Sequence, residues 1–343
     1  MSVSYGGDSI TFADGSVQSG GWTGMKNRII NGAMVIDQRN AGASVSITDS
    51  TVVFLTDRFR FDENTDGSFS AQQVSTAPSG FINSLKFTVT SADTSLAAGQ
   101  YANMRQNIEG LNVADLSWGT ASAATVTLSF WVYSSLTGTF GGSLRNSAAD
   151  RSYPFTYSIS SANTWEQKSI TVAGDTSGTW LTTNGIGLTV IWGFGVGSTY
   201  SGTPNVWQAG NYLAPTGATS VVGTNGATFY ITGVQLERGS TASSFEYRPY
   251  GTELALCQRY YELYDGSTLY LSKTRESTRD KRGNYYYKVT KRASATLTII
   301  TSNADGGGAI AGSSGTDGGN FESLSTSDGQ TPFVSKFSGS AEL

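Results

Sequence analysis

Short runs of alternating apolar and polar residues, separated by glycine, serine and asparagine, constrain the fold of this chain more than any other feature of its sequence. In one such run Val126, Leu128 and Phe130 alternate with positions that point to the opposite face, Trp131 and Tyr133 among them. Because apolar groups occur on both faces, this run predicts a strand that is covered on both sides.

Runs of this kind recur throughout residues 27–248. Apolar residues open the region at residues 29–36, and the predicted strands follow at residues 44–47, 58–61, 68–74, 84–90, 101–108, 124–134, 138–146, 152–160, 166–173, 187–196 and 227–236. Many short strands separated by turn residues are typical of a β-sandwich. We therefore predict an all-β fold whose main domain is a jelly-roll β-sandwich.

One later stretch has the spacing of a helix instead. Leu254, Cys257 and Tyr261 fall on one helical face, and Pro249 suits the turn before a helix. We predict a junction helix over residues 249–264. A helix of about three turns is marginal alone in water, so its apolar face needs a partner. Either the preceding domain or further copies of the chain can supply it, which makes these three residues an interdomain or oligomer seam.

Two segments flank the sandwich and the helix. Residues 1–26 contain a predicted β-hairpin around Asp14-Gly15, a pair favoured in tight turns. Residues 265–343 are predicted to form a smaller β-rich C-terminal domain. Its low apolar content favours a trimer, because burial rises with assembled size. Its expected strands are residues 284–290, 295–301 and 333–337, and its glycine-rich residues 305–319 are expected to be exposed loops.

Missing residue types exclude several functions. The chain has no histidine, the commonest general base and metal ligand. Its one cysteine, Cys257, excludes an internal disulfide and a cysteine zinc site. A net charge of −4 with 14% charged residues gives no reason to expect nucleic-acid binding. No apolar run approaches the ~20 residues that span a bilayer, and the N-terminus lacks the pattern of a secretory signal.

Four blocks of the sequence resemble a known family. Residues 27–40 (NRIINGAMVIDQRN), 127–147, 163–180 and 229–261 look like the carbohydrate-binding-module-like jelly roll of many bacteriophage tail-fibre and related virion fibre proteins. The spelling VQLERGS…FEYRP…CQRYY in the last block is the most specific part. The resemblance implies a homotrimeric fibre that is attached to other virion proteins through its N-terminal segment. It also implies that the domain after the helix is the outer one.

A glycan-binding surface needs exposed aromatic rings, on which sugars stack, beside polar groups that bind hydroxyls. Packing within a loop or a subunit contact is the alternative role for such rings. The arginines of the C-terminal domain belong to a mixed charge cluster, which is either a solvated loop, an interchain salt-bridge ring or a patch for anionic glycans. The candidates are Trp180, Tyr200, Trp207, Asn211 and Tyr212 in loops of the sandwich, and Tyr270, Arg275, Arg282 and Tyr286 in the C-terminal domain.

The acidic stretch at residues 57–66 is a weak candidate for other chemistry. Its DENTDG spelling indicates first a turn, then a cation-binding loop with Asp62 and Asp66 as ligands for Ca²⁺. A catalytic carboxylate pair, as in glycosidases, is the third interpretation. The long repeats of β-helical depolymerases are missing from the sequence, and so is a phosphate-binding glycine loop followed by lysine. We expect no catalytic residues, no enzyme activity and no other cofactor.

These observations predict a bacteriophage virion fibre or spike subunit that binds a host cell-surface glycan. We expect it to assemble as a homotrimer in the host cytoplasm and to end on the virion. Two alternatives remain: a purely structural virion component, such as a capsid-decorating or tail protein, and a polysaccharide depolymerase.

Overall fold

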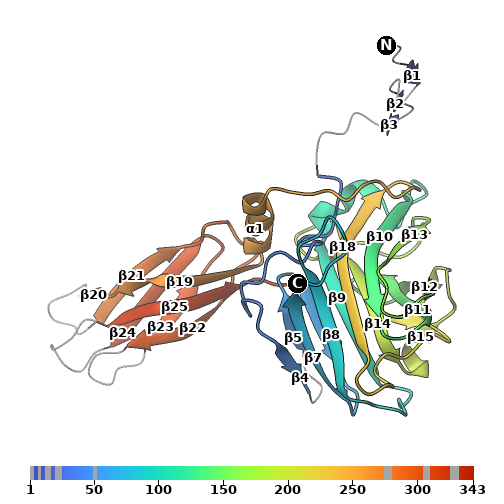
Figure 1. The fold of residues 1–343 in the computed structure, drawn as a ribbon. Coiled ribbons are helices and arrows are strands. Elements are labelled where there is room, and N and C mark those ends of the chain that lie inside the picture. Colours follow the sequence, from blue (N-terminus) through green and yellow to red (C-terminus); the bar gives the residue numbers. More distant parts are fainter. Residues whose placement is uncertain are drawn as a thin grey trace.

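The computed structural model describes residues 4–6, 9–11, 17–19, 25–48, 52–273, 280–303, 310–324 and 332–343. These residues form mostly antiparallel strands (Figure 1). At the N-terminus, β1 (Ser4–Gly6), β2 (Ser9–Thr11) and β3 (Val17–Ser19) pair in that order. The antiparallel pairing of β2 with β3 confirms the predicted hairpin, while its Asp14-Gly15 turn lies outside the described residues.

Two large sheets pack face to face and form the main domain, which we call the sandwich. Both are antiparallel throughout, which confirms the predicted all-β sandwich. In spatial order the first sheet contains β13 (Glu166–Val172), β10 (Val126–Ser134), β18 (Thr228–Arg238), β8 (Ser84–Ser91), β7 (Ser68–Val74) and β4 (Val45–Ile47). The second contains β16 (Gln208–Ala209), β12 (Arg151–Ile159), β11 (Gly138–Arg145), β14 (Ile186–Val196), β9 (Tyr101–Glu109), β6 (Phe59–Glu63) and β5 (Val52–Thr56). Two short strands, β15 (Ser201–Gly202) and β17 (Ala214–Pro215), form a separate parallel pair.

The core of the sandwich is filled by every second residue of its strands. Leu128 and Phe130 of β10 are fully buried, as the alternation predicts. On the outer face of the same strand, Tyr133 packs against Trp165 and Tyr230, with ring centroids 5.6 and 5.0 Å apart. The strand with apolar groups on both faces is thus covered by the core on one side and by aromatic neighbours on the other.

Residues 29–36, which the sequence predicts as the start of the β region, form turns instead of a strand. The chain turns at Asn31 and Met34, whose φ angles are 60° and 56°. The buried Asn31 side chain donates to the carbonyl oxygens of Ile36 and Asp57, at 2.8 and 3.0 Å, and accepts from the Ile36 N–H at 2.9 Å. It therefore satisfies backbone groups that a neighbouring strand would otherwise pair.

The junction helix is shorter than predicted. Helix α1 (Tyr250–Gln258) begins after Pro249, as expected, but strand β19 (Tyr261–Tyr270) occupies the rest of residues 249–264. The aromatic residues after the helix pair with a later strand, and aromatic runs favour strands over helices. No helix among the described residues is long and apolar enough to cross a bilayer.

The apolar face of α1 has its partner inside this chain. Cys257 is fully buried and packs with Ile30, and Leu254 packs against the same cluster. Burial raises the pKa of the Cys257 thiol, which stays protonated. Tyr261 is 8% exposed, and the Arg39 guanidinium lies 3.6 Å from the centre of its ring. The three predicted seam residues therefore hold together the two domains of one chain.

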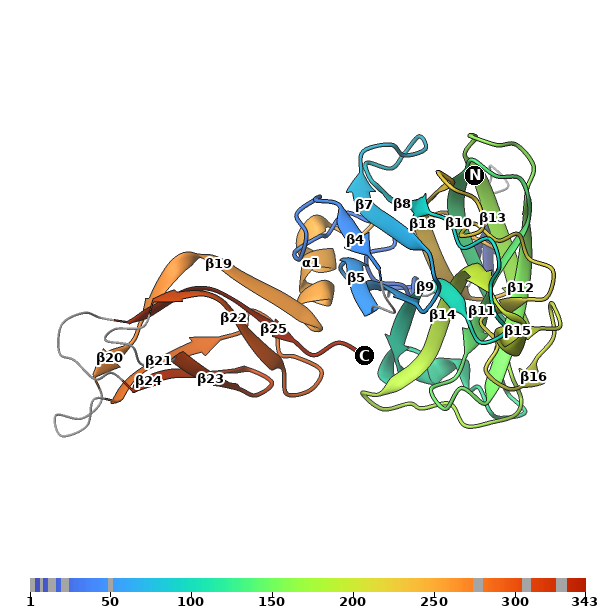
Figure 2. The ribbon, with the colours of Figure 1, turned by 90° about the horizontal axis from the view of Figure 1, so that it is seen from below.

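The C-terminal domain is a second, smaller pair of sheets (Figure 2). Its core contains Leu271, Tyr285, Phe321, Val334 and Phe337. One sheet has the order β19, β25 (Phe333–Ser340), β22 (Thr296–Asn303), and the other has the order β20 (Ser272–Lys273), β21 (Asp280–Tyr286), β24 (Gly318–Leu324), β23 (Ile310–Ser314).

The sequence predicts that the glycine-rich residues 305–319 are exposed loops. Residues 305–309 lie outside the described residues, and the rest of the stretch is not simply loop. It contains β23 and the first residues of β24. A side chain at Gly319 would place its Cβ 1.9 Å from the Ser313 carbonyl oxygen. Glycine is needed there because the two strands approach closely.

The C-terminal residues run back to the sandwich and link the two domains. Glu342 forms ion pairs with Arg39, at 3.0 Å, and with Arg58. The Asn107 side chain of β9 donates to the Leu343 carbonyl oxygen at 2.8 Å. A polar network therefore fills the junction beside the apolar cluster of α1.

Asp57 in this network makes stability depend on pH. Its side chain is 1% exposed, and it accepts hydrogen bonds from the backbone and side-chain nitrogens of Gln38, at 2.9 and 2.5 Å. Burial raises the pKa of its carboxyl from 3.8 to about 6, although Arg39 and Gln38 act in the opposite direction. The folded protein thus favours the protonated form. This contribution is complete below about pH 4 and is lost as the pH rises through about 6.

We expect Asp57→Asn to remove this pH dependence. The wild-type free energy of unfolding should fall between about pH 4 and pH 6 by at most about 3 kcal/mol from this group. Urea unfolding across that range measures the effect. Asp66→Asn is the control, because Asp66 is exposed and its variant should keep the wild-type slope. A wild-type slope in Asp57→Asn would contradict the assignment.

Candidate functional site

Trp180 and Trp207 come together with a third tryptophan, Trp118, which the sequence did not single out. The three rings pack edge to face, with centroids 4.7 to 5.5 Å apart. Their indole N–H groups are occupied: that of Trp207 donates to Ala173 O at 2.7 Å and that of Trp180 to Ser177 O at 3.1 Å. The three tryptophan rings therefore pack against one another.

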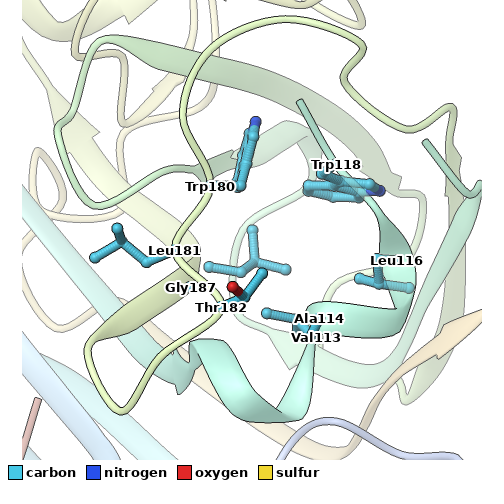
Figure 3. Close-up of a pocket in the computed structure, with 9 residues that line it drawn as sticks. Val113, Ala114, Leu116, Trp118, Trp180, Leu181, Thr182 and Gly187 are labelled. Carbon is cyan, nitrogen blue, oxygen red and sulfur yellow. The ribbon is translucent and has the colours of Figure 1, made fainter. Parts of the chain in front are cut away.

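The hollow beside Trp118 and Trp180 is too small for a sugar. It is lined also by Leu116 and Leu181 and encloses about 10 Å³ (Figure 3), which is room for about one water molecule. The sequence left two roles open for Trp180 and Trp207, glycan binding and packing. Packing within the loop fits this geometry.

Tyr200, Asn211 and Tyr212 lie elsewhere, along the second sheet of the sandwich. The ring of Tyr200 meets that of Tyr101 on β9 at 5.2 Å, nearly perpendicular. The Asn211 side-chain oxygen accepts a hydrogen bond from Arg145 on β11. The loop that carries these residues is bonded to β12, where the Ser152 hydroxyl accepts from the Tyr212 N–H at 3.1 Å. The candidates of the sandwich therefore form two groups, not one.

The C-terminal candidates are also divided. Leu269 and Leu271 pack in the core, so Tyr270 between them points out of the sheet that contains β19. Tyr285 packs in the same core, so Tyr286 points out of the sheet that contains β21. The two tyrosines are 64% and 79% exposed, on opposite outer faces of the domain.

Arg282 lies four residues before Tyr286 on β21. It forms an exposed ion pair with Glu322 at 3.4 Å. Residues 282 and 286 share a face, because side chains alternate along a strand. Arg275 lies outside the described residues. Of the four C-terminal candidates, the structure thus places Arg282 and Tyr286 on one surface.

Tyr286 borders an open hollow of about 390 Å³, a size typical of small-ligand sites. We call it the Tyr286 hollow, and its lining is Asn284, Tyr285, Tyr286, Gly315, Thr316, Asp317, Gly318 and Gly319. It offers one exposed ring beside an amide, a hydroxyl and a carboxylate.

Hydrogen bonds fix the turn that closes the Tyr286 hollow. The N–H groups of Tyr287 and Lys291 donate to the carbonyl oxygens of Asp317 and Thr316, at 2.9 and 2.8 Å. The Asp317 carboxylate accepts from the hydroxyl groups of Thr290, at 2.7 Å, and Thr316, at 3.1 Å. Each carboxylate oxygen has capacity for a further donor, such as a sugar hydroxyl.

The weak metal candidates do not form a cation site. The Asp62 Oδ2 atom lies 2.7 Å from Arg60 Nη2 and 2.5 Å from Arg105 Nη2, and two guanidinium groups repel a metal cation. Asp66 is exposed, and its backbone N–H donates to Asp93. In the part of the chain that the structure describes, no three Asp, Glu, Cys or His side chains are arranged to hold a metal ion.

No protein family and no curated protein matches this sequence. Among solved structures, the enzymatically active domain of bacteriophage CBA120 tailspike protein 4 is 14% identical, with a TM-score of 0.29, over 62% of this chain and 21% of that chain. A putative sugar binding protein from Bacteroides thetaiotaomicron is 9% identical, with a TM-score of 0.34, over 62% of this chain and 100% of its own.

The family 11 carbohydrate-binding module of a cellulosomal cellulase from Clostridium thermocellum is 13% identical, with a TM-score of 0.28, over 59% of this chain and 98% of that module. Because these TM-scores are low, we base no functional conclusion on the similarities. The fold class follows from the sheets described above.

Proposed function

We propose that this chain is a subunit of a bacteriophage virion fibre or spike that binds a host cell-surface glycan through the Tyr286 hollow. In this proposal it is a binding protein and not an enzyme, and it forms a homotrimer. Residues 1–26 attach it to the particle, and the C-terminal domain faces the host. The sequence blocks that resemble phage fibre proteins support the virion role.

The exposed ring of Tyr286 carries the binding proposal. At 79% exposure, its face is free to stack against a sugar. Asn284 and Asp317 line the same hollow and supply a donor, and acceptors, for sugar hydroxyls. The strands and the bonded turn hold these groups in place before a ligand arrives, which lowers the entropic cost of binding.

Tyr286→Ala should weaken glycan binding about tenfold, because the stacking face is lost while the buried core is untouched. The measurement is binding of the full chain to an array of bacterial surface polysaccharides, followed by titration of each one that binds. Tyr270→Ala is the matched control, since Tyr270 is a similarly exposed tyrosine on the opposite face.

Equal losses in both variants, or none in Tyr286→Ala, would refute the Tyr286 hollow as the site. If the full chain binds no polysaccharide, glycan recognition itself fails. Release of reducing ends from a bound polysaccharide would instead support the depolymerase alternative.

An exposed apolar patch supports assembly with neighbouring subunits. Ile82, Tyr247 and Tyr250 are 75%, 57% and 63% exposed and line one hollow beside α1. This patch fits a subunit contact in the proposed trimer, and it equally fits the alternative of a purely structural virion component. A monomeric mass by light scattering at micromolar concentration would remove the trimer from the proposal.

A further inference from the structure

Three arginines gather on the outer face of the seven-stranded sheet, and we call them the arginine cluster: Arg60 on β6, Arg105 on β9 and Arg145 on β11. Arg60 and Arg105 are directly opposite each other in the strand register. Asp62 binds both of them through its Oδ2 atom. The Arg105 Nε–H also donates to the Asn103 side chain at 3.0 Å.

Arg145 has no carboxylate partner among the described residues. Its hydrogen bond goes to the neutral side-chain oxygen of Asn211, and its Nε–H has no partner. The Nε–H of Arg60 and the Oδ1 atom of Asp62 are also buried, and neither has a partner among the described residues. The cluster therefore holds three guanidinium groups against one carboxylate, with polar atoms still unpaired.

This arrangement is costly unless an anion completes it. A cation removed from water without a counter-charge loses hydration that nothing replaces. Burial lowers the pKa of Arg145 to about 10, and the charge of Arg105 acts in the same direction. At neutral pH the guanidinium still carries its charge. The unpaired positive charge is thus present in the folded protein.

Two of the three arginines keep part of their side chains exposed. Arg60 keeps 24% of its side chain exposed and Arg145 is half-buried, whereas Arg105 is 7% exposed. Tyr101 is close enough to raise the pKa of both Arg105 and Arg145. Its ring meets the half-buried ring of Tyr200. The arginine cluster therefore lies near a pair of partly exposed tyrosine rings.

We infer that the arginine cluster binds the carboxylate of an acidic sugar residue in the host glycan. This rests on the proposed glycan-binding function and adds a second contact surface, in the sandwich, to the Tyr286 hollow. A guanidinium fork binds a carboxylate through two parallel hydrogen bonds. The Asn211 amide and the rings of Tyr101 and Tyr200 are suited to the sugar that carries the carboxylate, which favours an acidic sugar over the bare side chain of a partner protein.

The test compares acidic polymers with matched neutral ones. The full chain is titrated with polygalacturonate and with the same polymer after methyl esterification of its carboxyl groups. Arg145→Gln should weaken binding of polygalacturonate about tenfold to a hundredfold and leave binding of the ester unchanged. Arg28→Gln is the control, because Arg28 belongs to a separate exposed pair with Asp115. It should bind both polymers as the wild type does.

A second measurement needs no variant and covers the case in which Arg145→Gln does not fold. Galacturonate, glucuronate and N-acetylneuraminate should each be compared with galactose and with sulfate for their effect on the wild-type melting temperature. A larger shift with at least one acidic sugar supports the inference. An equal shift with sulfate shows a site for any anion and overturns the inference of an acidic sugar, as does the absence of a larger shift with every acid.

Two further outcomes separate the inference from related proposals. If neutral glycans bind and depend on Tyr286 while none of the acids binds, the inference fails and the proposed function stands. If Arg145→Gln lowers the molecular mass in light scattering, the cluster binds a carboxylate of a neighbouring copy, and the inference is wrong.

Discussion

Lys291→Met is expected to destabilise the protein by about 3–5 kcal/mol, the largest effect among the changes considered. Lys291 is fully buried. Its ammonium group donates to Glu262 Oε2 at 2.7 Å and to the carbonyl oxygen of Gln258, the last residue of α1, at 2.6 Å. Methionine has similar length but no charge, so the variant leaves the buried Glu262 carboxylate without its counter-ion.

Lys288→Met is the matched control for this change. Lys288 is exposed, and the contact it makes with Glu262 is a backbone N–H donation that a side-chain change retains. Denaturant unfolding should show a wild-type midpoint for Lys288→Met. The double variant Lys291→Met with Glu262→Gln should recover part of the loss, because no charge remains buried. Equal stability of Lys291→Met and Lys288→Met would show that the ion pair of Lys291 with Glu262 does not stabilise the fold.

Glu109→Gln is expected to have the second-largest effect, a loss of about 2–4 kcal/mol. Glu109 ends β9, and its carboxylate is 1% exposed. It accepts from Arg259 Nε and Nη2, at 2.9 and 2.6 Å, and from the Tyr260 hydroxyl at 2.7 Å. Both partners lie between α1 and β19, so this carboxylate ties the junction to the sandwich. In the variant, the glutamine NH₂ group would face the N–H and O–H donors of Arg259 and Tyr260 instead of accepting hydrogen bonds from them.

The pH dependence of Glu109 has the opposite sign to that of Asp57. Burial acts to raise the pKa of Glu109, but the hydrogen bonds from Arg259 and Tyr260 outweigh it and leave the pKa below its ordinary value. Its stabilisation is therefore present above the unfolded-state pKa and is lost as the pH falls through the folded-state value. Glu109→Gln should lose stability at neutral pH and approach the wild type in acid.

Asp115→Asn is the control for Glu109→Gln. Asp115 pairs with Arg28 at 2.7 Å, but 44% of its side chain is exposed, and exposed pairs contribute little. Thermal unfolding at neutral pH should separate the two variants clearly. A shift of the same size in both would mean that the junction does not depend on Glu109.

The candidate site was only partly visible in the sequence. Tyr286 was predicted, because consecutive tyrosines in a strand must expose a ring. Asn284 and Asp317 were not, since the turn that carries Asp317 reaches β21 only through the pairing of β24 with it. The glycine-rich sequence at the start of β24 gave no sign of this pairing. A glycine-rich turn near an exposed aromatic pair was the one signal that could have indicated it.

The arginine cluster was invisible in the sequence for a related reason. Arg60, Arg105 and Arg145 belong to three different predicted strands, and nothing in their spacing says that β6, β9 and β11 share a sheet face. The sequence offered an anionic-glycan patch only in the charge cluster at residues 273–282, as one alternative to a solvated loop or an interchain salt-bridge ring. Strand order, which depends on pairing between distant segments, brings the three arginines together.

By itself, the sequence determined the all-β fold, most strands of the sandwich and the start of α1 after Pro249. These depend on local periodicity and on a missing backbone donor, which neighbouring residues dictate. Only the tertiary structure decided that Tyr261 begins a strand, that Cys257 faces its own sandwich, and which aromatic residues share a surface. Those outcomes depend on pairing and burial between distant segments, which residue spacing alone does not reveal.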